Sequence, residues 1–462
     1  MTRQISEFGP SAGLSIITSQ VHGFDHTVRD DERSEARATM GLSCTTFAAS
    51  RMLPLCTLLV AAVPTLAGPS AAPVRSSLHV VRAGALESTT SLREGVKPSP
   101  QYYWNVNSPN NSEIEANLTA AGMRSIHFGQ VALLGQDFGL FPCLACAGPS
   151  RADAHGGIPQ RADLSAHLKQ LSADLESKPP SGWAKPLPPR FDGYIVLDYE
   201  SWRANWGWTN TPYRNASLAY TSSKDPSLNA SALARAAEAQ YNQSAMEFLV
   251  ASMRVLRQRY PQARGVGMYD YPLALAYPFG FGINGSCGAT RTGCPRSDCP
   301  WPQCGAGQRA QDDAMLPLYR EMTALYPSLY LTHPSDWNET DAIHNLEMIE
   351  GAAAESFRIA DLVGLPRHAV VPYTWYRYHD GGPASLTLLN DTDANLEFSV
   401  ASRSFFGFGG THDARVENFL IYGAESNLPK RPDGSIPIRP GESGPSVEET
   451  VAFFNRHKHL FR

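Results

Sequence analysis

Seven short apolar or aromatic runs recur along the chain, and helical patterns separate several of them. The two clearest helical patterns cover Ser231 to Tyr260, which Pro261 closes, and Ala342 to Val363. Strands that alternate with helices imply parallel crossovers, and seven strands in one chain favour a closed α/β barrel over an open sheet. The expected strands lie in the runs that begin at Tyr102, Val131, Tyr194, Gly265, Ser328, Val370 and Phe419.

The bulk composition fits one large barrel and excludes nucleic acid as the main partner. The chain has 462 residues and a hydrophobic content of 42%, which is enough for a sizeable core. Its formal net charge is -5, whereas neutralising phosphates needs a basic surface. The same charge weighs mildly against a strongly anionic polymer, although a local basic groove can exist under a net negative charge.

An apolar run that begins at Met52 and ends in small residues has the pattern of a secretory signal. It is too short for a stable membrane span, and we expect cleavage after Ala67 or Ala72. If the run is retained instead, it becomes an anchor and the polar residues before it a cytoplasmic tail. The expected layout is a disordered extension or gene-model artefact at 1–51, a signal peptide at 52–72, a linker at 73–98 and a barrel at 99–462.

Two further features favour a secreted glycoprotein. An even number of cysteines follows the expected signal, which suggests disulfides in an oxidising compartment: Cys143, Cys146, Cys287, Cys294, Cys299 and Cys304. Asn-x-Ser/Thr acceptor sites favour surface loops, at Asn110, Asn117, Asn215, Asn229, Asn242, Asn284, Asn338 and Asn390.

Four of these cysteines crowd into a Gly- and Pro-rich insertion at 284–307. A four-thiolate zinc site is the alternative there, but the spacings are irregular for it, so we expect a disulfide-stapled loop and no metal. The pairing of Cys143 with Cys146 stays open, because residues so close do not automatically form an unstrained bridge. A redox CxxC motif is possible in principle, yet no thioredoxin-like pattern surrounds it.

The third expected strand ends in two carboxylates, within the run FDGYIVLDYESWR from Phe191 to Arg203. Side chains two apart on a strand share a face, so Asp198 and Glu200 leave the strand side by side. Crowded like charges resist ionising together, which keeps a proton available near neutral pH for a general acid. An Asp-x-Glu pair is often only solvated surface charge, but the preceding residues are too apolar for a surface turn.

Catalytic groups of α/β barrels lie at the C-terminal ends of the strands, which is where this pair falls. Aromatic side chains at a strand end can stack on the faces of sugars, although a single one is more often part of the core. Several aromatic residues follow the other expected strands, and together with the carboxylate pair they predict a carbohydrate cleft. The residues at the other strand ends are Asn105, Asp270, Tyr271, Tyr330, Trp375, Tyr376, Tyr378 and Tyr422.

Several segments, in order, resemble the hyaluronidases of animals and venoms, a family of glycoside hydrolases. The matching segments are YYWNV at 102, VALLGQDFGLFP at 131, GGIPQ at 156, YIVLDYESWR at 194, LYPSLYL at 325, VVPYTWYRYHD at 370 and FLIYG at 419. The resemblance covers about residues 100 to 427, and ordered agreement is more specific than any one motif. It implies a distorted TIM-like (β/α)7 barrel.

The resemblance also implies a substrate-assisted retaining mechanism, in which the acetamido oxygen of the sugar attacks the anomeric carbon. Glu200 is then the general acid and later the base, and Asp198 holds the acetamido group. Arg203 orders the carboxylates or faces an acidic sugar. The expected substrate-binding residues are Tyr330, Tyr422, Arg203, Tyr271 and Trp375. No cofactor is implied.

The sequence departs from the family pattern at two positions near the site. The seventh strand ends in Tyr422 where the family has Trp, and Leu275 stands where it has an active-site Tyr, unless Tyr271 or Tyr277 substitutes. These changes leave acid catalysis intact and put the choice of polymer in question. The expected partner is hyaluronan, chondroitin or another N-acetylhexosamine polysaccharide, cut by a monomeric enzyme.

Two alternatives remain. A chitinase-like barrel also uses an acetamido-assisted Glu after Asp-x-Glu, but here Asp192 and Gly193 lie one residue too far from Asp198 for that motif. A non-catalytic sugar-binding glycoprotein could have kept the barrel and lost turnover. Retention of both carboxylates argues against it, since buried paired carboxylates destabilise a fold that does not use them.

Overall fold

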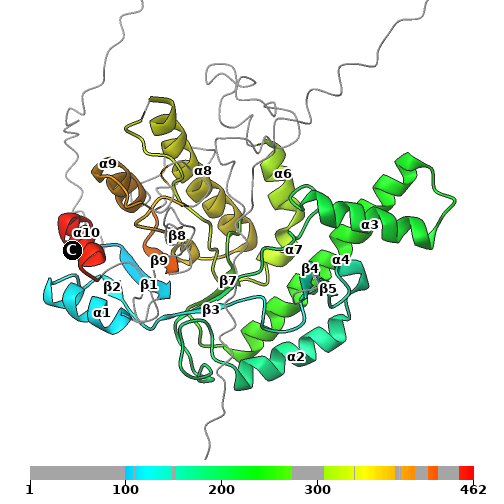
Figure 1. Cartoon of the computed structure of the whole chain (residues 1–462), viewed down its shortest axis with the longest axis horizontal. Helices are drawn as coiled ribbons and strands as arrows, with labels where there is room; N and C mark the ends of the chain where they lie inside the picture. The colour runs from blue at the N-terminus through cyan, green and yellow to red at the C-terminus, as the bar shows by residue number, and fades with distance from the viewer. Residues whose placement is uncertain are drawn as a thin grey trace, which may run out of the picture. The chain divides into compact units, whose positions relative to one another are not determined.

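A computed structural model describes residues 99–107, 110–147, 152–272, 306–337, 339–379, 384, 387–400, 415–424 and 447–461. The strands are β1 (Gln101–Asn107), β2 (Ile126–His127), β3 (Val131–Leu134), β4 (Cys143–Ala147), β5 (Ala152–Ala154), β6 (Tyr194–Leu197), β7 (Gly265–Met268), β8 (Tyr373–Thr374) and β9 (Asn418–Ala424). The helices are α1 (Asn111–Ala120), α2 (Leu164–Ser177), α3 (Thr211–Lys224), α4 (Ala230–Arg259), α6 (Ala306–Ala314), α7 (Leu316–Tyr319), α8 (Glu339–Val363), α9 (Asp391–Asn395) and α10 (Val447–Arg456) (Figure 1).

Parallel pairing runs around a closed ring of seven segments, as the sequence predicts. β2, β1, β9 and β8 form one parallel sheet, and β3, β6 and β7 form another. Only residues 128–130 separate β2 from β3, so one short stretch of chain contributes to both sheets and joins them on one side. On the other side the stretch 325–331 bridges β7 and β8, through the parallel pairs Tyr269–Tyr326, Leu325–Val370 and Ser328–Tyr373. The protein is thus an α/β barrel.

Two glycines allow β7 to approach the bridging stretch closely. A Cβ at Gly267 would lie 2.3 Å from the carbonyl oxygen of Ala324, and one at Gly265 would lie 2.5 Å from the Ala324 Cβ. Any larger residue would force the two segments apart, because real Cβ atoms do not come so near. The bridging stretch 325–331 is the fifth segment of the ring in chain order. It is therefore held by close backbone packing and isolated bridges more than by a continuous ladder of hydrogen bonds.

The helices cover the outside of the ring and bury the stripe expected from the sequence. In α4 the predicted stripe is buried throughout, at Tyr241, Ala245, Phe248, Leu249, Ser252, Met253 and Leu256. α2 lies beside α4, and α10 packs against α1, which brings the end of the described chain back to the first strand (Figure 1). In the part of the chain that the structure describes, no helix is long and apolar enough to cross a membrane.

Several sequence predictions lie outside the described residues. They are the N-terminal extension, the signal peptide, the linker, the Cys-rich insertion with its four cysteines, and Leu275 and Tyr277. One disulfide is present where the sequence left the pairing open: Cys143 and Cys146 are bonded, with their Cα atoms 5.7 Å apart. Both cysteines lie in β4, which follows β3 and pairs with β5 in a short antiparallel sheet.

Candidate active site

The C-terminal ends of the parallel strands share one rim, because all seven segments run in the same direction. The β1–β9 register places Asn105 directly beside Tyr422 at this rim. Asp198 follows the last residue of β6, and Asp270 follows β7 by two residues. The expected carboxylates and most of the expected aromatic residues are therefore brought to the same end of the barrel.

Asp198 and Glu200 are both partly exposed, whereas Tyr199 between them is buried. The hydroxyl of Tyr199 donates to the carbonyl oxygen of Pro142 over 2.6 Å, and its ring stacks on Phe141 at 4.3 Å. Trp202 donates to the same carbonyl over 2.8 Å. Tyr199 and Trp202 thus fix the loop after β6 to the backbone at Pro142. Both carboxylates stay at the rim.

Part of the Asp198 side chain still reaches solvent, yet the surrounding protein controls its ionisation. Burial, and then the charge of Glu200, raise the pKa of Asp198 to about 8, although Arg203 opposes the shift. Asp198 therefore keeps its proton at neutral pH. One of the two carboxyl groups thus has the raised pKa that their spacing predicts.

Arg203 connects the carboxylate of Glu200 to a third acid. Its Nη2 lies 3.2 Å from Oε1 of Glu200 and 3.1 Å from Oδ2 of Asp270. Burial tends to lower the pKa of the guanidinium, but Asp270 and Glu200 more than offset it, so Arg203 stays charged. The Arg203 backbone is fixed from α4, since the Tyr241 hydroxyl donates to its carbonyl oxygen over 3.0 Å.

Sequence reasoning placed Asp270 at the rim but assigned it no role in the site. Its φ of 60° is unusual for a residue other than glycine, and Asp is among the residues that tolerate it best. Burial raises the pKa of Asp270 to about 6, against the effect of Arg203. Its position in the sequence could have identified Asp270 as a site residue. It follows β7 by two residues, just as Asp198 and Glu200 closely follow the neighbouring strand β6.

An aromatic wall forms beside the carboxylates from residues on three neighbouring segments. Tyr330 stacks on Tyr422 with ring centroids 5.9 Å apart, and Trp375 meets both rings edge-on at 6.0 and 5.8 Å. His379 also stacks on Tyr330, with ring centroids 5.3 Å apart. Three of the expected substrate-binding residues, Tyr330, Tyr422 and Trp375, therefore lie together, and Tyr422 keeps some exposure to solvent.

Two polar groups in this wall are buried without a partner. The Tyr330 hydroxyl makes no hydrogen bond of ordinary geometry with the described residues, and neither does the Trp375 indole nitrogen. Burial raises the pKa of Tyr330 well above its usual value, and the nearby Tyr269 adds to this, so the hydroxyl keeps its proton. Unpaired buried polar groups are costly, and in a cleft they are candidates for contact with a ligand.

Tyr373 extends the wall towards the carboxylates, which the sequence did not predict. Asn105 donates to its hydroxyl over 2.9 Å, and its ring meets those of Tyr269 and Tyr422. The pKa of Tyr373 is raised well above its usual value by burial and by the charge of Asp198. It therefore stands close to Asp198 as a neutral hydroxyl.

Three aromatic residues expected at the rim are used elsewhere. Tyr271 is fully buried, and its hydroxyl accepts from the backbone N–H of Ala204 over 3.2 Å. It therefore fixes the backbone next to Arg203. Tyr376 packs against Phe454, and Tyr378 donates to Asp393. Their contacts are those of packing residues, and any effect of Tyr271 on a ligand acts through Arg203.

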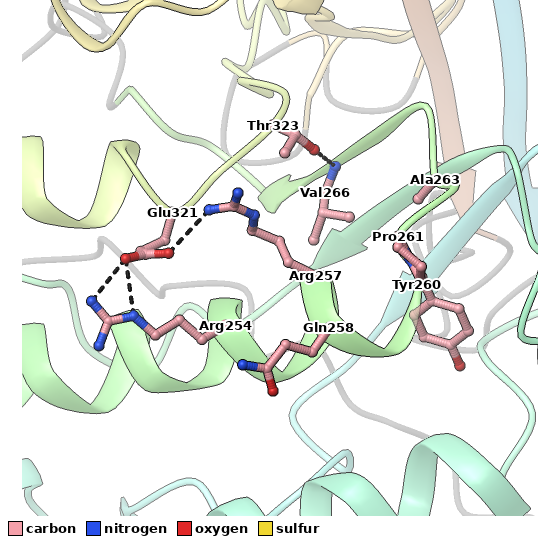
Figure 2. Close-up of a pocket in the computed structure, with 9 residues that line it drawn as sticks. All are labelled: Arg254, Arg257, Gln258, Tyr260, Pro261, Ala263, Val266, Glu321 and Thr323. Carbon is pink, nitrogen blue, oxygen red and sulfur yellow. Dashed lines mark hydrogen bonds and ion pairs between the residues drawn. The ribbon is translucent and has the colours of Figure 1, made fainter.

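A surface pocket of about 520 Å³ lies apart from this rim (Figure 2). It is formed by the end of α4, the start of β7 and the residues before the fifth segment, which is the opposite end of the barrel. In it Glu321 accepts from Arg254 over 2.8 Å and from Arg257 over 3.0 Å. Among the described residues, no cluster of three His, Cys, Asp or Glu side chains is arranged to hold a metal ion.

Comparison with known proteins gives a consistent match. The sequence model of the family described as Hyaluronidase matches residues 129–395. Human Hyaluronidase-1 is 29% identical over 234 residues, covering 50% of this chain and 47% of that protein. Hyaluronidase from the bee Apis mellifera is 25% identical over 304 residues, covering 65% and 68%. The chain thus spans about half the length of the mammalian relatives that it matches.

Among solved structures, bee venom hyaluronidase in complex with a hyaluronic acid tetramer has a similar fold, with a TM-score of 0.54. Its sequence identity is 22%, and the match covers 70% of this chain and 90% of that one. The barrel described above is therefore shared with that protein.

Proposed function

The chain belongs to the hyaluronidase family, and from this we propose that it is a glycoside hydrolase acting on hyaluronan- or chondroitin-like glycosaminoglycans. The observation that carries the proposal is the pair Asp198 and Glu200 at the end of β6, in which Asp198 keeps its proton at neutral pH, beside a wall of aromatic rings. Two neighbouring carboxyl groups can divide the work, because one can protonate a leaving oxygen while the other stabilises the charge that develops. Aromatic rings provide faces on which sugars stack.

In the proposed reaction Glu200 is the general acid. It gives its proton to the glycosidic oxygen as the bond to the anomeric carbon breaks, and the acetamido oxygen of the same sugar forms a new bond to that carbon. Glu200 then takes a proton from the water that opens the oxazolinium ring, so the configuration is retained. Arg203, 3.2 Å away, fixes the orientation of the carboxyl group.

Asp198 is proposed to serve the acetamido group. As the acetamido oxygen attacks, positive charge develops on the attached nitrogen, and a carboxylate beside its N–H stabilises that charge. In the empty site Asp198 holds a proton below about pH 8. As substrate binds, this proton passes to solvent, which Asp198 still reaches, and the ionised carboxylate then interacts more strongly with the developing cation than with the neutral acetamido group.

The aromatic wall is proposed to bind the sugar that carries the acetamido group. The unpaired hydroxyl of Tyr330 would donate to the acetamido oxygen, and Tyr422 with Trp375 would form the stacking surface. Tyr271 would contribute indirectly, by holding the segment of Arg203.

A second candidate substrate is a neutral N-acetylhexosamine polymer such as chitin. One observation favours it: Arg203 is already bound by two carboxylates, and Asp198 adds a third acid to the same space. The described part of the site therefore offers little positive charge to a polyanion.

The experiment is a panel of purified polysaccharides with the protein freed of residues 1–72. Hyaluronan, chondroitin, chondroitin sulfate and chitin oligomers are incubated at pH 4 to 8, and new reducing ends are measured. We expect N-acetylhexosamine reducing ends from at least one glycosaminoglycan. Cleavage of chitin oligomers alone would favour the second candidate, and unsaturated uronic ends would indicate a lyase and overturn the mechanism.

A further inference from the structure

Two carboxylates share a single nitrogen of Arg203. Glu200, on the loop after β6, and Asp270, after β7, both approach Nη2, at 3.2 and 3.1 Å. The exposed fractions of the Arg203 and Asp270 side chains are 17% and 18%, whereas that of Glu200 is 38%. The arginine and Asp270 thus form the inner part of the cluster, and Glu200 faces the cleft.

The backbone at Asp270 is shaped to bring its carboxylate to this place. Its N–H donates to the carbonyl oxygen of Tyr326 over 2.9 Å, and its φ is 60°. This conformation costs most residues about 1 kcal/mol or more and is less costly for Asp, Asn and Gly. Such a conformation at the edge of an active site is a reason to ask what the side chain does.

We propose that Asp270 is a positioning residue of the active site. Its carboxylate interacts with the same positive charge of Arg203 as Glu200 does. The arginine can therefore orient Glu200 without forcing its carboxyl group into the ionised form. The proposal rests on the role of Glu200 as the general acid. A carboxyl group that is the sole partner of a guanidinium would be a poor proton donor, because an adjacent cation favours the charged form of the carboxyl group. Asp270 supplies the counter-charge, while its fixed position keeps Arg203 aimed at Glu200.

The charges around the cluster come from three elements. The loop after β6 brings Asp198, Glu200 and Arg203, and the end of β7 brings Asp270 between Tyr269 and Tyr271. His379, beyond β8, also faces Asp270 and favours its ionised form. Above about pH 6 Asp270 is ionised and partly neutralises the charge of Arg203. Below that pH it is protonated and has little effect on the arginine.

The test compares the wild-type protein with Asp270→Asn. Asn keeps the shape and the backbone preference of Asp but removes the charge. We expect the alkaline limb of the kcat/KM profile to move to lower pH by about one unit, the typical effect of a neighbouring charge. The two profiles should converge below about pH 6, where wild-type Asp270 is neutral. Asp270→Glu, which restores the carboxylate, should move the limb back towards the wild-type position.

Glu321→Gln is the matched control, because it removes another carboxylate shared by two arginines, at the opposite end of the barrel (Figure 2). Its profile should coincide with that of the wild type. If Asp270→Asn does not fold, Asp270→Gly replaces it, since glycine adopts a φ of 60° without strain. A folded variant with an unshifted limb would overturn the proposal.

A second measurement does not depend on turnover. The carboxyl carbon of Glu200 is followed by 13C NMR titration in wild type and Asp270→Asn. We expect Glu200 to ionise at lower pH in the variant, and identical titrations would overturn the proposal. If the wild type cuts no polysaccharide, the proposed function fails, while the titration still decides whether Asp270 controls Glu200.

Discussion

The ring of Tyr330 stacks on that of Tyr422 with centroids 5.9 Å apart and an angle of 27° between their planes. Tyr330 lies in the bridging stretch 325–331 and Tyr422 lies in β9, so closure of the ring of strands brings the two rings together. The Tyr330 hydroxyl is buried beside them and makes no hydrogen bond of ordinary geometry with the described residues, although Tyr269 lies close to it. A group of this kind costs stability in the empty protein and becomes useful when a ligand supplies the partner.

Tyr330→Phe should therefore lower activity without lowering stability. Loss of one hydrogen bond that positions the acetamido oxygen for its attack should reduce kcat/KM by about 10- to 100-fold. The melting temperature should stay the same or rise, because a buried hydroxyl without a partner is removed. Steady-state kinetics and thermal unfolding measure the two effects.

Tyr326→Phe is the control for this variant. Tyr326 lies on the same segment, is fully buried, and its hydroxyl also has no partner among the described residues. Its ring meets Tyr194 and, at 6.3 Å, Tyr373, but its hydroxyl lies beside Gly265 at the start of β7, away from the rim. We expect an unchanged kcat/KM, and equal losses in both variants would contradict a specific role for Tyr330.

Asp198→Asn should stabilise the protein in a pH-dependent way. The folded state holds a proton on Asp198 up to about pH 8, whereas the unfolded chain releases it near the ordinary value of about 4. The folded state thus binds more protons between these values, and this residue makes stability fall as pH rises through that window. Asn cannot ionise, so the variant should melt higher than wild type at pH 8 and similarly at pH 4.

Asp192→Asn is the comparison for this effect, because Asp192 begins the same run and is exposed. Its melting temperature should follow that of the wild type at every pH. A variant Asp198→Asn that gains nothing between pH 4 and pH 8 would contradict the raised proton affinity of the pair.

Much of the barrel follows from sequence pattern alone. The stripe of α4 is specified by apolar residues at helical spacing, and the predicted helix Ser231 to Tyr260 appears as Ala230–Arg259. Five of the seven runs contain strands of four residues or more, since apolar residues follow one another without interruption. The runs at Ser328 and Val370 form only bridges and a two-residue strand, because proline and close packing interrupt their ladders.

The site was less predictable than the fold. Asp198 and Glu200 could be found because two carboxylates end one buried strand, a local pattern. The meeting of Arg203 with Asp270 depends on residues 67 positions apart and on a positive φ, neither of which periodicity reveals. Tyr271 was expected in the cleft because of its place at a strand end, but its orientation depends on the Ala204 N–H, a tertiary contact.

Salt should distinguish the two candidate substrates. Above about pH 8 Asp198 and Asp270 are both ionised beside the single positive charge of Arg203, so a polyanion approaching the described site is repelled and salt screens that repulsion. Raising NaCl from about 20 to 150 mM, which shortens the screening length to about 8 Å, should lower KM for hyaluronan and leave KM for chitin oligomers unchanged. A KM for hyaluronan that rises steeply with salt would instead indicate a basic binding surface.

The central claim is that Glu200 donates the proton that breaks the glycosidic bond, and its most direct test is polymer cleavage by Glu200→Gln. The amide keeps the size of the side chain but cannot donate that proton, so reducing ends should appear at least about 100-fold more slowly than with the wild type. Circular dichroism and thermal unfolding should be unchanged. A folded Glu200→Gln protein that cuts the polymer as fast as the wild type would contradict the account.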